Sequence, residues 1–238
     1  MRKLLLVSAI LTAALTAAAQ SPDSVIPKPN DVTLTDGVYV FQDEPKVECR
    51  VLGMRSHLPA FPEGGYEMTI TKRGVKILAS DESGLFYARQ TLDQMTGGGK
   101  VKELQCCRIL DIPRFPYRGL HVDVSRHFRS VDFLKKQIDA MAAFKMNRMH
   151  LHLTDAAGWR LQIDAYPRLT EFAAWRPEAY WKDWWKGERR YAEEGTPGAY
   201  GGYYTKEEIR DIVAFCKERF IEVIPEFDIP GHTTALVS

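Results

Sequence analysis

The sequence predicts an α/β protein in two parts, a small α/β module followed by a stretch in which strands and helices alternate. Apolar runs of strand length alternate with helical apolar stripes throughout the second half of the chain. Between the two parts, Pro113 and Pro116 restrict the backbone and mark a boundary. We therefore expect a first domain over residues 21–112 and a second domain over residues 113–238.

The first twenty residues have the pattern of a secretory signal peptide. Arg2 and Lys3 precede an apolar run, and the small residues from Ala17 to Ala19 provide a cleavage site near its end. The apolar run is shorter than a membrane-spanning helix. We expect residues 1–20 to be removed and the mature protein to be exported, periplasmic or secreted, with no membrane anchor.

Composition limits the partners further. The formal net charge is +1 and no long basic or acidic run occurs, so nothing favours nucleic acid or an anionic membrane as a partner.

The four cysteines, at positions 49, 106, 107 and 216, are too few for a disulfide scaffold. Cys216 lies on a predicted helical stripe and is interpreted as a core residue. We expect no essential disulfide and no metal bound by these thiols.

The first domain has local signals for three strands and one helix. Alternating patterns predict strands over residues 32–41, 66–71 and 75–79. Asp81 can cap a helix that continues to Met95 with its apolar residues on one side. Because no cluster of catalytic residue types occurs here, we interpret this part as a support domain.

In the second domain, predicted strands alternate with predicted helices. Strands are predicted over residues 120–124, 148–153 and 222–225. Between them, Ser130 can cap one helix, and Thr205-Lys-Glu-Glu208 is a capping box that begins another. This order is typical of the first three units of a (β/α)₈ barrel, and it fits a doubly wound sheet equally well.

Polar residues follow each strand of the second domain. Arg126 and His127 follow the first strand, Asp155 follows the second, and Asp228 and His232 follow the third. Chemistry gathers at the carboxyl ends of parallel strands, so we expect a site there. Taken singly, each residue also fits a structural role, such as a surface salt bridge or a helix cap.

Aromatic residues crowd the connection between residues 156 and 204. All five tryptophans fall between Trp159 and Trp185. Long connections are often functional or carry their own structure, and aromatic rings suit the apolar faces of sugars. We expect most of these rings to pack a satellite cluster, with Trp159 as the best candidate for a ligand contact.

Four motifs in order then indicate a family. They are Arg118-Gly-Leu-His-Val-Asp-Val-Ser-Arg-His-Phe128, His150-Leu-His-Leu-Thr-Asp155, Gly158-Trp-Arg160 and Pro225-Glu-Phe-Asp-Ile-Pro-Gly-His232. From about residue 65 to its end, the chain resembles the family 20 glycoside hydrolases, the β-N-acetylhexosaminidases. The resemblance implies a small non-catalytic domain followed by a (β/α)₈ barrel, of which this chain would contain about three units. It implies no cofactor.

The resemblance also implies a reaction and residue roles. The substrate would be a glycan ending in β-linked N-acetylglucosamine or N-acetylgalactosamine, hydrolysed with retention by its own 2-acetamido oxygen. Arg126 matches the arginine that holds sugar hydroxyls. Asp155 and His232 match groups that support the general acid, with Asp228 assisting and His127 as supporting architecture.

One departure from the family pattern is large. The family's catalytic pair is an adjacent Asp-Glu after the fourth strand, and the sequence reaches Ser238 before that strand. We therefore expect the catalytic pair beyond Ser238 and no catalytic residue in this chain, which would be a fragment without meaningful activity of its own.

Two alternatives remain. His150 and His152 lie on one face of a strand and, with Asp155 and His232, could bind a catalytic metal in a metal-dependent (β/α)₈ hydrolase. Against this alternative, the family implied by the flanking residues needs no metal, so we expect no metal site. The second alternative is a non-catalytic carbohydrate-binding fragment that contacts sugar through Arg126, Asp155 and Trp159.

Overall fold

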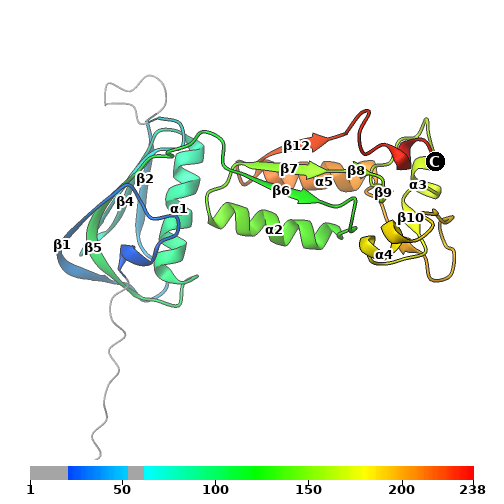
Figure 1. Cartoon of the computed structure of the whole chain (residues 1–238). Helices are drawn as coiled ribbons and strands as arrows, with labels where there is room; N and C mark the ends of the chain where they lie inside the picture. The colour runs from blue at the N-terminus through cyan, green and yellow to red at the C-terminus, as the bar shows by residue number, and fades with distance from the viewer. Residues whose placement is uncertain (1–20, 53–61) are drawn as a thin grey trace, which may run out of the picture.

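The computed structural model describes residues 21–52 and 62–238. Figure 1 shows two sheets joined in series, the first covered on one face by a single helix and the second flanked by two helices. The proposed signal peptide, residues 1–20, lies outside the described residues. In the part of the chain that is described, no helix is long and apolar enough to cross a membrane.

The first sheet has five strands in the order β1-β5-β3-β4-β2. The three strands predicted from sequence are present. The bounds are β1 (Asp31–Val40), β2 (Val47–Val51), β3 (Tyr66–Thr71), β4 (Gly74–Ala79) and β5 (Glu103–Asp111). The sequence analysis did not identify β2 or β5, although β5 pairs with both β1 and β3.

Helix α1 (Glu82–Thr96) covers one face of this sheet (Figure 1). Asp81 caps it as expected, since its side chain accepts a hydrogen bond from the Gly84 backbone N–H at 2.9 Å. Gly97 ends it in the left-handed conformation, with φ of 57°. The buried side of α1 packs against the strands, and Cys107 of β5 lies in the same core.

The second sheet has three parallel strands in the order β12-β7-β6. These are β6 (Gly119–Asp123), β7 (Arg148–His152) and β12 (Glu222–Glu226), each within two residues of its predicted bounds. Because the strands are parallel, their carboxyl ends meet at one edge. We call this edge the carboxyl edge; Asp123, His152 and Glu226 lie in register across it.

Two capped helices cover the second sheet. Ser130 caps α2 (Val131–Ala143), and Thr205 with Glu208 forms the predicted capping box of α5 (Lys206–Lys217). Leu134, Ile138, Met141 and Ala142 of α2 are buried, as their spacing predicts. Cys216 is also buried in this core. All four cysteines are free thiols.

The long connection after β7 carries short elements of its own. They are β8 (Thr154–Asp155), β9 (Gly158–Trp159), α3 (Arg168–Glu171), β10 (Trp175–Arg176), α4 (Trp181–Lys186) and β11 (Tyr200–Gly201). Two 3₁₀ turns, η1 (Pro22–Ser24) and η2 (Thr234–Leu236), complete the elements of the described residues. Trp184 is fully buried against Ala156 and Ala157, which makes it part of a satellite core as expected.

The two sheets are connected through a buried lysine. Lys145 follows α2, and its ammonium group contacts the Asp111 carboxylate at 2.7 Å and the Tyr66 hydroxyl at 3.0 Å. Gln94 of α1 donates to the Ala143 carbonyl at 2.8 Å. These contacts tie the first domain to the amino-terminal side of the second sheet, opposite the carboxyl edge.

Candidate active site

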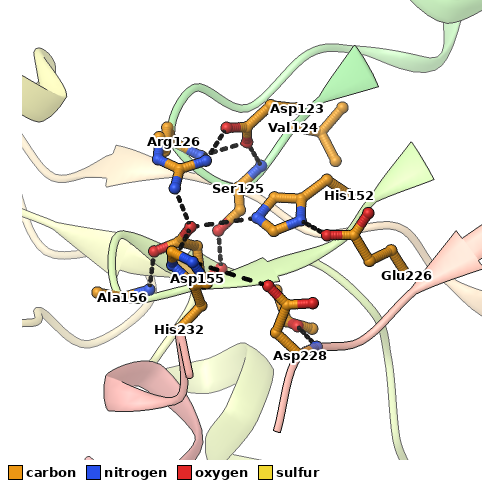
Figure 2. Close-up of polar contacts among 12 residues, drawn as sticks. Asp123, Val124, Ser125, Arg126, His152, Asp155, Ala156, Glu226, Asp228 and His232 are labelled. Atoms are coloured by element: carbon orange, nitrogen blue, oxygen red, sulfur yellow. Dashed lines mark hydrogen bonds and ion pairs between the residues drawn. The ribbon is translucent and has the colours of Figure 1, made fainter. Parts of the chain in front are cut away.

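The candidate site lies at the carboxyl edge and is centred on Asp155 (Figure 2). Its side chain is only 4% exposed. Oδ1 accepts a hydrogen bond from the Ala156 backbone N–H at 2.6 Å. Oδ2 faces three cationic or polar groups, with Arg126 Nη2 at 2.5 Å, His232 Nδ1 at 2.9 Å and His152 Nε2 at 3.2 Å. One carboxylate therefore organises side chains from three different segments.

Arg126 lies between two carboxylates. Its Nη1 pairs with Asp123 Oδ2, and its Nη2 pairs with Asp155. Asp123 Oδ1 also accepts the backbone N–H groups of Ser125 and Arg126, each at 3.0 Å, which fixes the turn after β6. The Arg126 side chain stays 36% exposed, so the guanidinium is held in place and still reachable by a ligand.

The ionisation of this pair follows from its contacts. Burial alone would lower the pKa of Arg126, but the hydrogen bond and charge of Asp123, with Asp155 and Asp228, raise it. Burial alone would raise the pKa of Asp123, yet hydrogen bonds from Arg126 lower it. Both groups are therefore charged at neutral pH.

His152 is the last residue of β7 and contacts the last residue of β12. Its Nδ1 lies 2.5 Å from Glu226 Oε1 on β12, and its Nε2 faces Asp155. Burial disfavours the imidazolium form, but hydrogen bonds to Glu226 and Asp155 outweigh it and raise the pKa of His152. The same contact lowers the pKa of Glu226 against the opposing effect of burial.

His232 and Asp228 come from the segment after β12. The His232 ring contacts Asp155 on one side and lies 3.9 Å from Asp228 Oδ2 on the other, with half of its side chain exposed. Its backbone is left-handed, with φ of 57°, which is uncommon for a residue other than glycine. The Asp228 backbone N–H donates to Thr154 Oγ1 at 3.3 Å, which anchors this segment to β8.

Two buried arginines support the turn that carries Arg126. Arg160 is fully buried and donates to the carbonyls of Val124 and Ser125, the two residues before Arg126. Arg176 is also buried and donates to the Arg126 carbonyl at 2.9 Å. These contacts hold the turn that presents the exposed guanidinium.

Trp159 and His127 have mainly packing contacts. Trp159 is 9% exposed, its Nε1 donates to the Leu161 carbonyl at 2.6 Å, and its ring lies 6.0 Å from that of Phe227. A ligand contact by Trp159 stays a prediction and would use the remaining exposed part of the ring. His127 packs against Tyr200, with the ring centroids 5.1 Å apart.

Ser238 lies outside the candidate site. Its hydroxyl donates to the Ala235 carbonyl at 3.0 Å, a local contact of the segment that follows η2. The Asp-Glu pairs that the sequence does contain, Asp43-Glu44 and Asp81-Glu82, belong to the first domain, far along the chain from the carboxyl edge. A catalytic Asp-Glu pair beyond Ser238 therefore stays a prediction.

One group of side chains has the composition of a metal site. His121, His152 and Glu226 each offer a ligand atom, and these atoms lie within 4.8 Å of one another. His150, which the sequence pointed to, has its Nε2 against Glu226 Oε2. In this structure the carboxylate oxygens of Glu226 are occupied by imidazole groups, so the cluster is already paired without an ion.

Comparison with known proteins decides the family. The model of the glycosyl hydrolase family 20 catalytic domain matches residues 115–238, and that of domain 2 of the same family matches residues 54–112. The chain belongs to glycosyl hydrolase family 20. The family identified from the four motifs is thereby confirmed.

Two similar proteins are named β-hexosaminidases. The chain is 40% identical over 204 residues to a β-hexosaminidase of Porphyromonas gingivalis, covering 82% of this chain and 24% of that protein. It is 36% identical over 222 residues to one of Akkermansia muciniphila, covering 92% and 41%. The chain thus spans less than half the length of either relative.

A solved structure of a family 20 enzyme also matches this chain. An exo-β-N-acetylglucosaminidase from Vibrio harveyi, in complex with N-acetylglucosamine, superimposes with a TM-score of 0.76 at 34% identity. The match covers 93% of this chain and 38% of that one. These relatives do not favour the metal-dependent alternative based on His150 and His152.

The structure brings together four of the residues singled out from the sequence. Arg126, Asp155, His232 and Asp228 converge at the carboxyl edge, while Trp159 lies in an adjoining cluster. Sequence reasoning missed Asp123 and Glu226. Strand alternation could have found them, because side chains two apart share a face and three parallel strands end at one level.

Proposed function

We propose that this chain forms the sugar-holding part of a β-N-acetylhexosaminidase that removes terminal β-linked N-acetylglucosamine or N-acetylgalactosamine. The observation that carries the proposal is the Arg126 guanidinium, held by two carboxylates and open to solvent. A guanidinium offers five fixed donors, and charged hydrogen bonds contribute about 1.5–3 kcal/mol each. Such a group suits several sugar hydroxyls at once.

In the proposed reaction the substrate supplies the nucleophile. The 2-acetamido oxygen attacks the anomeric carbon, the glycosidic bond breaks, and water later opens the resulting oxazolinium ion with retention. This route needs no nucleophilic side chain at the carboxyl edge. Asp155 and His232 would form a carboxylate–imidazole couple that orients the general acid, and Asp228 would hold the far side of the His232 ring.

We further propose that the three-stranded second sheet is the beginning of a (β/α)₈ barrel. Its parallel order, its covering helices and its functional edge all match the first three units of such a barrel. A complete barrel takes roughly 250 residues. The catalytic Asp-Glu pair that the family resemblance implies is absent from the carboxyl edge described above, so the 238-residue chain should bind sugar weakly and not turn it over.

The proposal is tested by separating binding from turnover. N-acetylglucosamine is titrated into the purified chain and followed by NMR, with the Arg126→Ala variant and an Arg129→Ala control. Arg129 is exposed and lies three residues away, so its loss should leave binding unchanged. Loss of sugar-dependent shifts in Arg126→Ala alone supports the proposal, and equal responses in all three proteins contradict it.

Turnover is measured on a chromogenic β-N-acetylglucosaminide. We expect no hydrolysis above background, because general acid catalysis typically supplies about 10²–10⁴-fold and the described carboxyl edge holds no Asp-Glu pair. Turnover at the rate of ordinary glycosidases would contradict this part of the proposal. Sugar binding without hydrolysis would also be the result for a protein that only binds carbohydrate; hydrolysis by a longer protein with the same residues would separate the two functions.

We also propose that the protein is exported, because residues 1–20 have the pattern of a cleaved signal peptide. Sequencing the amino terminus of the protein from cell fractions tests this. A mature protein that begins near residue 20 in the periplasm or medium supports export, and an uncut protein in the cytoplasm contradicts it.

A further inference from the structure

We propose that Glu226 and His152 are positioning residues, forming a carboxylate–imidazole–carboxylate bridge that fixes Asp155 and, through it, Arg126. Neither residue would touch the sugar. The bridge runs from Glu226 on β12 through His152 on β7 to Asp155 on β8 (Figure 2). Its functional meaning rests on the proposed function, since Arg126 is the group that would meet the substrate.

The geometry of His152 carries the inference. Its side chain is 4% exposed, and each ring nitrogen faces a carboxylate, with Nδ1 2.5 Å from Glu226 and Nε2 3.2 Å from Asp155. A neutral imidazole has one N–H donor and one lone pair, so it would present that lone pair to one of the carboxylates. Only the doubly protonated ring donates to both.

The charges around His152 agree with this protonation state. Asp123 faces it from β6, Glu226 from β12 and Asp155 from β8, and all three favour the cation. Three other imidazoles and one guanidinium also lie around His152. His121 lies 5.8 Å away between ring centroids, His232 lies 6.1 Å away, and Arg126 and His150 are each already paired with a carboxylate.

Glu226 is itself firmly held. Its Oε1 contacts His152, while its Oε2 contacts His150 and lies 3.6 Å from His121. Each of these partners is an imidazole on β6 or β7, so the carboxylate has few alternative positions. This makes Glu226 the fixed end of the bridge.

The other end of the bridge is Asp155. Its Oδ1 is anchored by the Ala156 N–H, but the direction of Oδ2 depends on the groups that donate to it. Arg126 and His232 are both partly exposed, whereas His152 is buried. His152 is therefore the only one of the three that can hold Oδ2 in place independently of ligand binding.

The test uses NMR of the histidine rings and the arginine side chains in the whole chain, without sugar. Wild type is compared with Glu226→Gln and with Glu222→Gln. Glu222 is the matched control, because it lies on the same strand and pairs with Arg148 near the surface, away from the bridge. Circular dichroism confirms that each variant is folded.

In wild type we expect both ring nitrogens of His152 to be protonated at neutral pH and rotation of the Arg126 guanidinium to be slowed. Glu226→Gln should return His152 to a neutral tautomer and speed Arg126 rotation, while Glu222→Gln should change neither. If His152 is neutral in wild type, or if Arg126 is unaffected in folded Glu226→Gln, the bridge does not position Arg126 and the inference is wrong.

A second variant and a second titration separate the possible failures. Glu226→Asp keeps the charge and should restore part of the slowed Arg126 rotation if Glu226→Gln folds poorly. N-acetylglucosamine is then added to the same samples. If wild type ignores the sugar while the bridge signals are as expected, the proposed function fails and the positioning inference stands. If sugar binds equally well to wild type and Glu226→Gln, the functional role of the bridge fails.

Discussion

Arg160 gives the sharpest test of how the site is supported. It is fully buried and donates to carbonyls from four separate segments: Val124 and Ser125, Ala157, Ala174, and Gly202. No carboxylate is among these partners. Burial, with the nearby Arg176 charge, lowers the pKa of Arg160 to about 10, so it remains charged at neutral pH. The perturbation we choose is Arg160→Met, which keeps a long apolar side chain and removes the five donors.

The expected loss follows from the carbonyls left behind. No described backbone hydrogen bond satisfies the carbonyls of Val124, Ser125 or Gly202, whereas Ala174 also accepts from the Gly202 N–H at 3.3 Å. Three unsatisfied buried carbonyls cost about 1–3 kcal/mol each, and removing a buried charge returns several kcal/mol. We expect the free energy of unfolding to fall by about 2–4 kcal/mol.

Urea unfolding followed by tryptophan fluorescence measures this loss. Arg210→Met is the control, since Arg210 pairs only with Glu207 at the surface and should change stability by no more than about 0.5 kcal/mol. Arg160→Lys distinguishes charge from geometry. A lysine has three donors on one point, so it should lose about as much stability as methionine if the planar fork is what matters. Arg160→Met with the stability of the Arg210→Met control would refute this account.

Three further predictions concern stability. Thr205→Ala removes the cap of α5 and should lower the free energy of unfolding by about 1 kcal/mol, measured by urea unfolding. Gly201→Ala would place its Cβ 2.1 Å from the Ala174 carbonyl oxygen and should cost about 1–3 kcal/mol, whereas Gly231→Ala, with open space around it, should be nearly neutral. The His152 bridge should stabilise most between pH 4.5 and 6.5, the ordinary pKa values of glutamate and histidine. The stabilisation by the bridge is lost when the pH falls through the lowered pKa of Glu226, and also when the pH rises through the raised pKa of His152. Glu226→Gln should therefore flatten the measured pH dependence of the free energy of unfolding.

The elements predicted correctly from sequence are those with local signals. Asp81, Ser130 and Thr205 were each expected to cap a helix, and each side chain accepts the expected backbone N–H. A cap and its partners lie within three residues of one another, so the sequence contains the whole interaction. The predicted strands over residues 66–71 and 75–79 are also close in sequence, and they pair directly with each other.

The features that were missed depend on distant partners. Strand β5 contains adjacent buried cysteines that interrupt any simple alternation, and its place between β1 and β3 is set by pairing with residues about 40 to 80 positions away. Glu226 directly follows the strand predicted over residues 222–225 and was given no role of its own. Its partner His152 is 74 residues away in sequence, and only the parallel register brings the two together. Strand alternation could place Glu226 at the end of its strand, but it could not identify this distant partner.

The site uses guanidinium groups in two different ways. Arg126 is paired with Asp123 and Asp155 and is partly exposed, an arrangement that leaves some of its donors for a ligand. Arg160 and Arg176 bind main-chain carbonyls and are buried, so their donors are directed to the backbone. Because carbonyl positions are set by the backbone, the buried pair fixes the turn itself, while the carboxylates fix the direction of the side chain upon it. A substitution that loosens either layer should therefore weaken sugar binding.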